Sequence, residues 1–94
     1  MKYIEGLVSV ITPTFRSADY IERAIDSILG QTYKNIECII INDNTPHDDY
    51  SQALYKKIEK YYADERFVFL EQPMHINGAA ARNYGIERAH GEYI

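Results

Sequence analysis

The side chain best placed to do chemistry in this 94-residue chain is the carboxylate of Asp43. It follows the apolar run 36–42, which reads Ile-Glu-Cys-Ile-Ile-Ile-Asn. Such a run is typical of a strand buried in a parallel sheet, and open α/β sheets bind ligands beyond the carboxyl ends of their strands. Asp43 is therefore a candidate ligand-binding residue, although an acid in this position can also cap the next turn through its own backbone.

The other reactive side chains show no catalytic or metal-binding arrangement. Cys38, the single cysteine, lies inside the apolar run, where a buried and inert thiol is expected. Asp48 and Asp49 suit the first turn of a helix, where acids interact favourably with the helix dipole. The three histidines share no metal-ligand spacing and are expected in loops or on the surface: His47, His75 and His90.

Length and charge exclude several classes of protein. A chain of 94 residues is enough for one small domain. Its 10 Lys and Arg residues are scattered and outnumbered by 14 Asp and Glu residues, so a nucleic-acid groove is not expected. No stretch approaches the roughly 18 apolar residues of a membrane span, and the first residues do not read as a signal peptide. We expect a cytoplasmic protein that reaches the inner face of a membrane only through other regions.

Apolar spacing predicts strands and helices in alternation. A strand over 7–12 is expected to end at Pro13, because proline donates no ladder hydrogen bond. A helix follows, with Ser17 as its N-cap and its end near Gly30. The later elements are a strand at 36–42, a helix marked by Leu54, Ile58 and Tyr61, a strand at 67–70, a loop at 73–77, a helix from Ala79 to about Ala89 that Gly91 ends, and the start of a fourth strand at 92–94.

This order favours right-handed βαβ units and a three-layer α/β domain with a parallel sheet. The turn after the first strand reads Thr-Pro-Thr-Phe-Arg-Ser over 12–17, with neither a glycine-rich dinucleotide fingerprint nor a P-loop. A phospho-acceptor receiver domain would need an acidic pair after the first strand, where this chain has Thr12 and Pro13. These three nucleotide and phosphate chemistries are thus disfavoured.

Four segments carry a specific resemblance. They occur in order along the chain as VSVITPTF (8–15), YIERAIDSILGQTY (20–33), ECIIINDNT (37–45) and ARNYGIERAHGEYI (81–94). Together they resemble the amino-terminal half of the family 2 inverting glycosyltransferases. The resemblance implies a Rossmann-like GT-A fold, of which residues 1–94 form the nucleotide-binding portion, truncated at the fourth strand. It further implies the strand order 3-2-1-4, with the first strand left as an exposed edge that invites self-association.

The resemblance also implies roles for five residues. Pro13, Thr14 and Phe15 match the loop that runs beside the nucleotide, with the aromatic ring against the base. Asp43 matches the family's base-reading aspartate, and a carboxylate can accept the N3–H of uracil. Arg82 matches a position near the nucleotide, where a guanidinium can meet an acceptor or a carboxylate.

Alternatives stand beside these roles. Phe15 could be a core aromatic, and Arg82 could form a structural ion pair with Asp43 or Glu87. The chain also departs from the family pattern: Arg16 replaces a common asparagine, the pair 44–45 replaces Gly-Ser, and the glycine before the third helix is shifted by one place. The path of these loops and the base preference are therefore open.

The activity implied is transfer of a sugar from a nucleotide-diphosphate sugar, with UDP the expected nucleotide, to a hydroxyl of a saccharide, lipid or protein acceptor, with inversion. In relatives a divalent ion, Mg²⁺ or Mn²⁺, is held by an Asp-x-Asp motif that would lie beyond Ile94. No catalytic or metal-binding residue is therefore expected within this chain, and the isolated chain is expected to be inactive. The alternative is a stand-alone α/β module that binds nucleotides or partners without catalysis.

Overall fold

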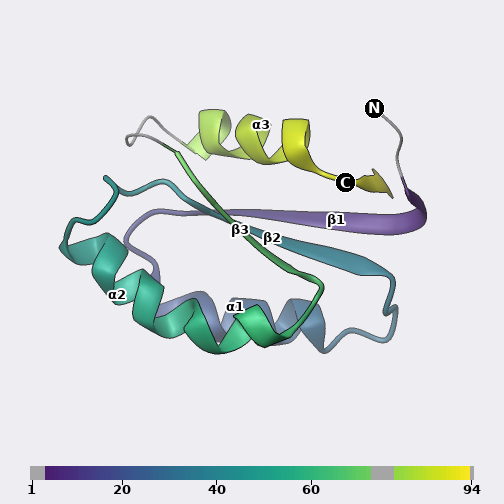
Figure 1. Cartoon of the computed structure of the whole chain (residues 1–94), viewed down its shortest axis with the longest axis horizontal. Coiled ribbons are helices and arrows are strands. Elements are labelled where there is room, and N and C mark those ends of the chain that lie inside the picture. The colour runs from purple at the N-terminus through teal and green to yellow at the C-terminus, as the bar shows by residue number, and fades with distance from the viewer. Residues whose placement is uncertain (1–3, 73–77, 94) are drawn as a thin grey trace.

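A computed structural model describes residues 4–72 and 78–93. Its four parallel strands lie in the order β3-β2-β1-β4, as expected. The strands are β1 (Ile4–Thr14), β2 (Ile36–Asn42), β3 (Phe67–Glu71) and β4 (Gly91–Tyr93). The helices are α1 (Ala18–Leu29), α2 (Asp49–Ile58), the 3₁₀ helix η1 (Glu59–Ala63) and α3 (Gly78–Arg88). Figure 1 shows β1 and β2 running across the molecule between the helices. The loop predicted at 73–77 falls outside the described residues.

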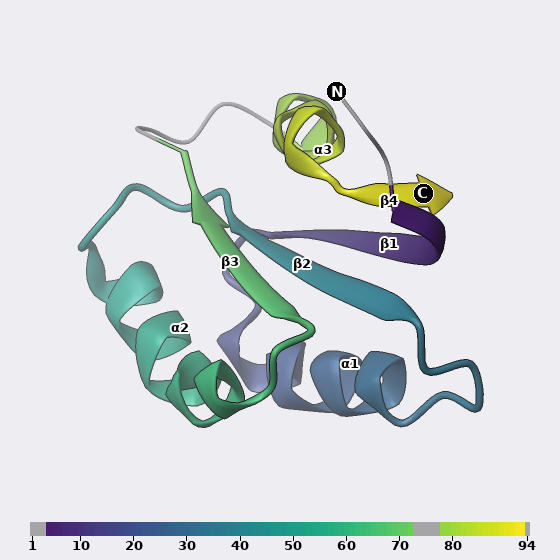
Figure 2. The same cartoon turned by 45° about the vertical axis from the view of Figure 1, so that its right-hand side comes forward.

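The sheet separates two layers of helices. Helices α1 and α2 cover one face, and α3 covers the other (Figures 1 and 2). All seven residues of β2 are buried, which is why its apolar run shows no alternation with polar residues. The three-layer α/β architecture is therefore confirmed.

Helix α3 lies close to the sheet because it presents small residues to it. Ala81 and Gly85, at i and i+4, are buried, and so is Ala89, the first residue after the helix. A Cβ atom on Gly85 would stand 2.5 Å from Cδ1 of Ile41 and 2.8 Å from Cγ2 of Ile11. A larger side chain at this position would push the helix off the sheet.

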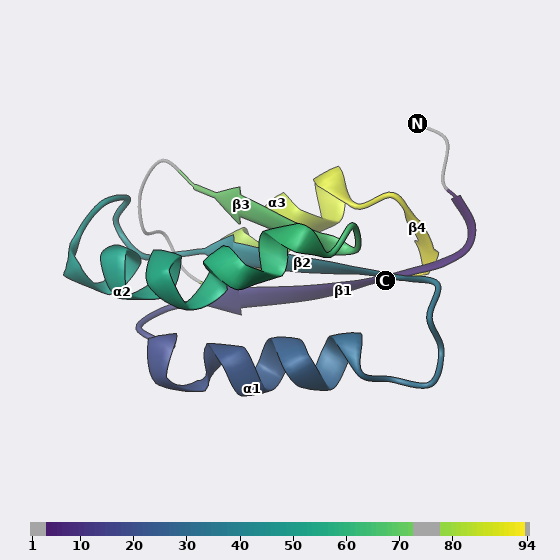
Figure 3. The same cartoon turned by 60° about the horizontal axis from the view of Figure 1, so that its bottom comes forward.

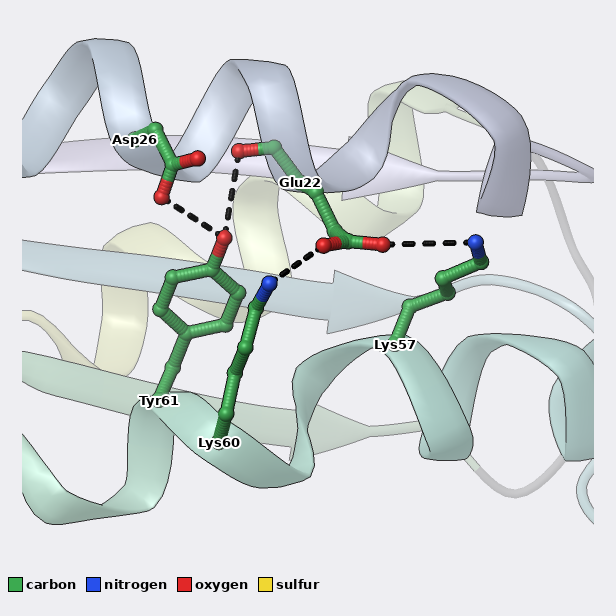
Figure 4. Close-up of polar contacts among 5 residues, drawn as sticks. All are labelled: Glu22, Asp26, Lys57, Lys60 and Tyr61. Atoms are coloured by element: carbon green, nitrogen blue, oxygen red, sulfur yellow. Dashed lines mark hydrogen bonds and ion pairs between the residues drawn. The ribbon is translucent and has the colours of Figure 1, made fainter.

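Helices α1 and α2 lie on the same side of the sheet (Figure 3), and polar contacts join them as well as the core (Figure 4). The Tyr61 hydroxyl lies 2.7 Å from Oδ1 of Asp26 and 3.2 Å from the Glu22 carbonyl oxygen. The Glu22 carboxylate pairs with Lys57 at 3.3 Å and also with Lys60. These contacts hold η1 and the end of α2 against α1.

Strand β1 does not end at Pro13, so that prediction was wrong. Pro13 lies within the strand, in register with Ile41. The N–H of Val8 bonds to the Asn35 carbonyl oxygen, and the carbonyl of Thr14 accepts from Asp43, so these even-numbered residues bond to the β2 side. Pro13, at the odd position, faces the other edge with its missing donor, where β4 does not reach.

Ser17 is the N-cap residue of α1, as predicted, but its side chain does not cap the helix, and the prediction for Gly91 was wrong. The Ser17 hydroxyl donates to the Phe15 carbonyl at 3.1 Å and makes no cap bond. Gly91 does not end α3, which stops at Arg88. Instead Gly91 begins β4, where it approaches β1 so closely that a Cβ would stand 2.5 Å from the Ser9 hydroxyl.

The edge of β1 is partly covered, contrary to expectation. β4 pairs with β1 at Ile4↔Gly91 and Val8↔Tyr93, because the short strand is anchored by a buried carboxylate. Glu37 on β2 accepts from the Ser9 hydroxyl (2.8 Å), from the His90 backbone N–H (2.9 Å) and from His90 Nδ1 (2.8 Å). The Ser9 oxygen in turn accepts from the Gly91 N–H at 2.9 Å. We call these four residues the Glu37 clasp.

Candidate functional site

The candidate site lies at the carboxyl ends of β1 and β2. The ladder continues one residue past β2, because the Asp43 N–H donates to the Thr14 carbonyl at 2.8 Å. Asp43 and Thr14 are buried, each only 1% exposed, whereas Phe15 is 44% exposed. The hydroxyl of Thr14 donates back to the Ile41 carbonyl at 2.9 Å. A buried carboxylate and an accessible aromatic ring thus follow two neighbouring strands.

A buried amide, Asn42, connects this edge to β3 and α2. Its Nδ2 donates to Oε2 of Glu71 (2.8 Å) and to the Ser51 hydroxyl (2.9 Å). Its Oδ1 accepts from the backbone N–H (3.0 Å) and from Nδ2 (2.9 Å) of Asn44. Ser51 in turn donates to the Thr45 carbonyl at 2.7 Å. Both polar atoms of the Asn42 side chain are therefore engaged, and they link the loop that carries Asp43 to β3 and α2.

Asn44 extends this network to the loop after β1. Its Oδ1 accepts from the Arg16 backbone N–H at 2.9 Å. Arg16 has a φ of 54°, in the left-handed region that non-glycine residues rarely adopt. Its guanidinium lies 4.8 Å from the Phe15 ring centre and 4.4 Å from that of Tyr50, both cation–π distances. The loop that holds Phe15 is thus fixed through its backbone and its side chains.

The start of α2 borders the same edge. Oδ1 of Asp48 accepts from the Ser51 N–H at 2.8 Å, so the predicted place of Asp48 at the helix start is confirmed. The Tyr55 hydroxyl contacts the Glu71 carboxylate. Burial and this carboxylate together raise the pKa of Tyr55, so the phenol stays protonated and donates to Glu71. A hollow of about 180 Å³ lies beside the loop, lined by Arg16, Ala18, Asp19, Tyr50 and Ala53.

The structure brings four of the five sequence-derived candidates together. Pro13, Thr14 and Phe15 form one continuous segment, and Asp43 is bonded to it. Arg82 is exposed on α3, and within residues 4–72 and 78–93 no hydrogen bond or ion pair joins it to the other four. Glu87, one partner considered for Arg82, pairs instead with the neighbouring Arg88 at 3.6 Å.

Sequence reasoning missed the residues that support the site. Asn42 was predicted only as the end of a strand, and Asn44 was noted only as a departure from the family pattern. No role was predicted for Glu71. A signal for Glu71 was present, because it ends the neighbouring strand β3 and the strand-end rule applies there as it does to β2. The contact of Glu71 with Asn42 depends on strand register, which the sequence does not display.

We also looked at the described residues for a metal site, a membrane-spanning helix and a second hollow. Among the residues that the structure describes, no three or more His, Cys, Asp and Glu side chains gather as a metal site. No helix in the described ranges is long and apolar enough to cross a membrane. A larger open hollow of about 700 Å³ involves Leu29, Tyr61 and Arg66, near the amino end of β3 and away from Asp43.

Comparison with known proteins identifies the family of this chain, and that family agrees with the α/β fold. The family model described as glycosyl transferase family 2 matches residues 9–94. An uncharacterized glycosyltransferase of Rickettsia typhi is 42% identical over 90 residues, covering 94% of this chain and 25% of the relative. Bacillus subtilis TuaG, provisionally named as a teichuronic acid biosynthesis glycosyltransferase, is 40% identical over 90 residues, covering 94% and 33%. Streptococcus pneumoniae glycosyltransferase GlyA is 33% identical over 91 residues, covering 97% and 12%.

The chain therefore belongs to glycosyl transferase family 2. It spans a third or less of the length of these relatives. The resemblance read from the four sequence segments is confirmed, and so is the α/β fold class. The roles of the five candidate residues and the cytoplasmic location stay predictions.

Proposed function

We propose that this chain is the donor-nucleotide half of a glycosyltransferase that transfers a sugar from a UDP-linked donor to an acceptor hydroxyl with inversion. The observation that carries the proposal is that buried Asp43 and exposed Phe15 lie next to each other, each at the carboxyl end of one of two adjacent strands. A carboxylate there can accept the N3–H of uracil, and an exposed ring can stack on the base. The support of the loop by Asn42 and Asn44 favours a site formed before the ligand binds.

Titration of the isotope-labelled chain with UDP tests this proposal. Backbone signals of residues 14–16 and 42–44 are expected to shift. Asp43→Asn is expected to weaken UDP binding by about 2- to 30-fold, because it exchanges a charged acceptor, worth about 1.5–3 kcal/mol, for a neutral carbonyl worth about 1 kcal/mol. Asp49→Asn, at an exposed acid of α2, is the matched control and should bind as the wild type does. Equal affinity of all three proteins would remove Asp43 from the site.

The chemistry beyond nucleotide binding is also a proposal. The family resemblance implies a divalent ion, but the described residues supply no group of ligands for it, so no step is derived through a metal. The isolated chain is expected to release no UDP from a UDP-sugar, and turnover would contradict this expectation. UDP as the nucleotide rests on the family resemblance, and the sugar and the acceptor are not assigned.

Self-association through β1 is a separate proposal. β4 covers the edge of β1 only as far as Val8. The remaining edge, to Thr14, has no strand partner within the described residues, and such edges invite pairing with another chain. Sedimentation equilibrium over a range of concentrations should show association, and a monomer at every concentration would contradict it.

A further inference from the structure

Gln72 occupies the position on β3 that Asp43 occupies on β2. The Gln72 N–H lies 3.4 Å from the Asn42 carbonyl oxygen, so this ladder also continues one residue past its strand. Because Asn42 pairs with Glu71, the next residues in register are Asp43 and Gln72. Neighbouring strands lie about 4.8 Å apart, so the two side chains start from adjacent points of the same edge.

Strand alternation assigns both side chains to the α3 face. Asn42 and Glu71 are directed toward α2, because they bond to each other and to Ser51 and Tyr55 of that helix. Successive residues of a strand point to opposite faces. Asp43 and Gln72, each one residue further along, are therefore directed away from α2.

The Gln72 carbonyl is an unsatisfied buried acceptor. Gln72 is only 3% exposed, and its Oε1 has no hydrogen-bond partner. Within residues 4–72 and 78–93 it is the only buried side-chain oxygen or nitrogen in this state. By contrast, the side-chain oxygen and nitrogen of Asn42 and of Asn44 on the same edge all make hydrogen bonds. Such a group is costly for a folded chain to keep, and its presence needs an explanation.

We propose that Gln72 is a specificity-determining residue whose carbonyl accepts a hydrogen bond from an N–H or O–H group of the donor nucleoside. This inference rests on the proposed function, since it needs a nucleotide at Asp43. Two adjacent acceptors on one edge fit a nucleoside that presents two donors. Uridine supplies them as the base N3–H and a ribose hydroxyl, and guanosine supplies them as two neighbouring N–H groups of its base.

The test replaces Gln72 with methionine, which has a similar length and no amide. Gln31→Met, at an exposed glutamine after α1, is the matched control. UDP, 2′-deoxy-UDP and GDP are titrated into each protein and followed by NMR. The preferred nucleotide is expected to bind Gln72→Met about three- to tenfold more weakly than it binds the wild type, and Gln31→Met with unchanged affinity.

The nucleotides identify which donor Gln72 reads. Loss of a preference for UDP over 2′-deoxy-UDP in Gln72→Met assigns the ribose 2′-hydroxyl. Loss of a preference for GDP over UDP assigns the edge of the base. Stability gives a second readout: the urea midpoint of Gln72→Met should equal or exceed that of the wild type, because an apolar side chain replaces an unsatisfied carbonyl.

The results that overturn the inference are distinct from those that overturn the proposed function. Unchanged affinity of Gln72→Met for every nucleotide that the wild type binds overturns the inference alone. So does a lower urea midpoint, because Gln72 would then support the fold. Failure of all three nucleotides to titrate the wild type overturns the proposed function, and the inference with it.

Discussion

Replacing Glu37 with glutamine is expected to loosen the attachment of β4 to the sheet. Glutamine has the same shape, and its carbonyl can still accept from the Ser9 hydroxyl and the His90 backbone N–H. It loses the charge of the carboxylate and presents an N–H₂ group where Oε2 accepts from His90 Nδ1. Because Glu37 and Ser9 are buried, water does not compensate for the weaker bonds at the retained oxygen.

The expected loss is roughly 2 kcal/mol of unfolding free energy near neutral pH. Hydrogen bonds to charged groups are worth about 1.5–3 kcal/mol and neutral ones about 1 kcal/mol, so all three contacts weaken, the third to a neutral bond between the glutamine N–H₂ group and His90 Nδ1. This is a large share of the total for a domain of about 5–15 kcal/mol. With an m value of about 1–2 kcal/mol/M, the urea midpoint should fall by about 1–2 M.

The loss should depend on pH. Burial raises the pKa of Glu37, but the hydrogen bonds from His90 and Ser9 outweigh it and hold that pKa below its ordinary value of 4.5. The stability gained from ionised Glu37 is therefore fully present above about pH 4.5 and is lost as the pH falls through the lower folded-state pKa. The difference between wild type and Glu37→Gln should be widest near pH 7 and close at lower pH.

Urea unfolding followed by far-UV circular dichroism between pH 3 and pH 7 measures this difference. Glu65→Gln, at an exposed glutamate, is the matched control and should follow the wild type at every pH. His90→Ala keeps the backbone donor and should lose less stability than Glu37→Gln. Equal midpoints for wild type and Glu37→Gln at pH 7, or a difference that persists unchanged to pH 3, would refute the clasp as described.

Three further predictions test the packing and the polar contacts. Gly91→Ala should lower the unfolding free energy by about 2–3 kcal/mol, since its Cβ would lie 2.5 Å from the Ser9 hydroxyl. Gly78→Ala, whose Cβ would have nothing within 4 Å, is the control and should not destabilise the chain. Urea midpoints compare the two variants. Tyr61→Phe should cost about 1 kcal/mol of unfolding free energy at pH 7. Burial, and then Asp26, raise the pKa of Tyr61, so the stability that its hydroxyl contributes is lost as the pH rises above about 10. The unfolding curves of the two proteins should therefore converge at alkaline pH. Burial raises the pKa of the Cys38 thiol to about 11, so alkylation by iodoacetamide at pH 8 should be far slower in the folded chain than in urea, and equal rates would contradict its burial.

The fold was predictable where one physical signal dominates. The run 36–42 predicted β2 with its observed bounds, because a central strand is buried on both faces and needs no alternation. The expected end of β1 at Pro13 failed because a proline is excluded from a ladder only on the side where a partner strand exists. Gly91 was misread as a helix end because its close approach to Ser9 is a contact between residues far apart in the sequence.

The candidate site was predicted as single residues, whose roles stay predictions, but not as an arrangement. Asp43 follows from the strand-end rule, and Phe15 follows from the family resemblance. The supporting contacts join Asn42 to Glu71 and Asn44 to Arg16, pairs separated by 28 or 29 residues. Such contacts are set by strand register, so a sequence shows the polar residues but not their partners.

Contact between the base of UDP and the Phe15 ring tests the central claim most directly. Intermolecular nuclear Overhauser effects are measured between ring protons of the isotope-labelled chain and the uracil H5 and H6 protons at saturating UDP. The proposed function predicts such effects at Phe15, and their loss in Phe15→Leu but not in Tyr20→Leu, which changes an exposed ring on α1. Effects at Tyr61 near the opposite end of β3, or none at Phe15 when UDP is saturating, would contradict nucleotide binding at the edge formed by Phe15 and Asp43.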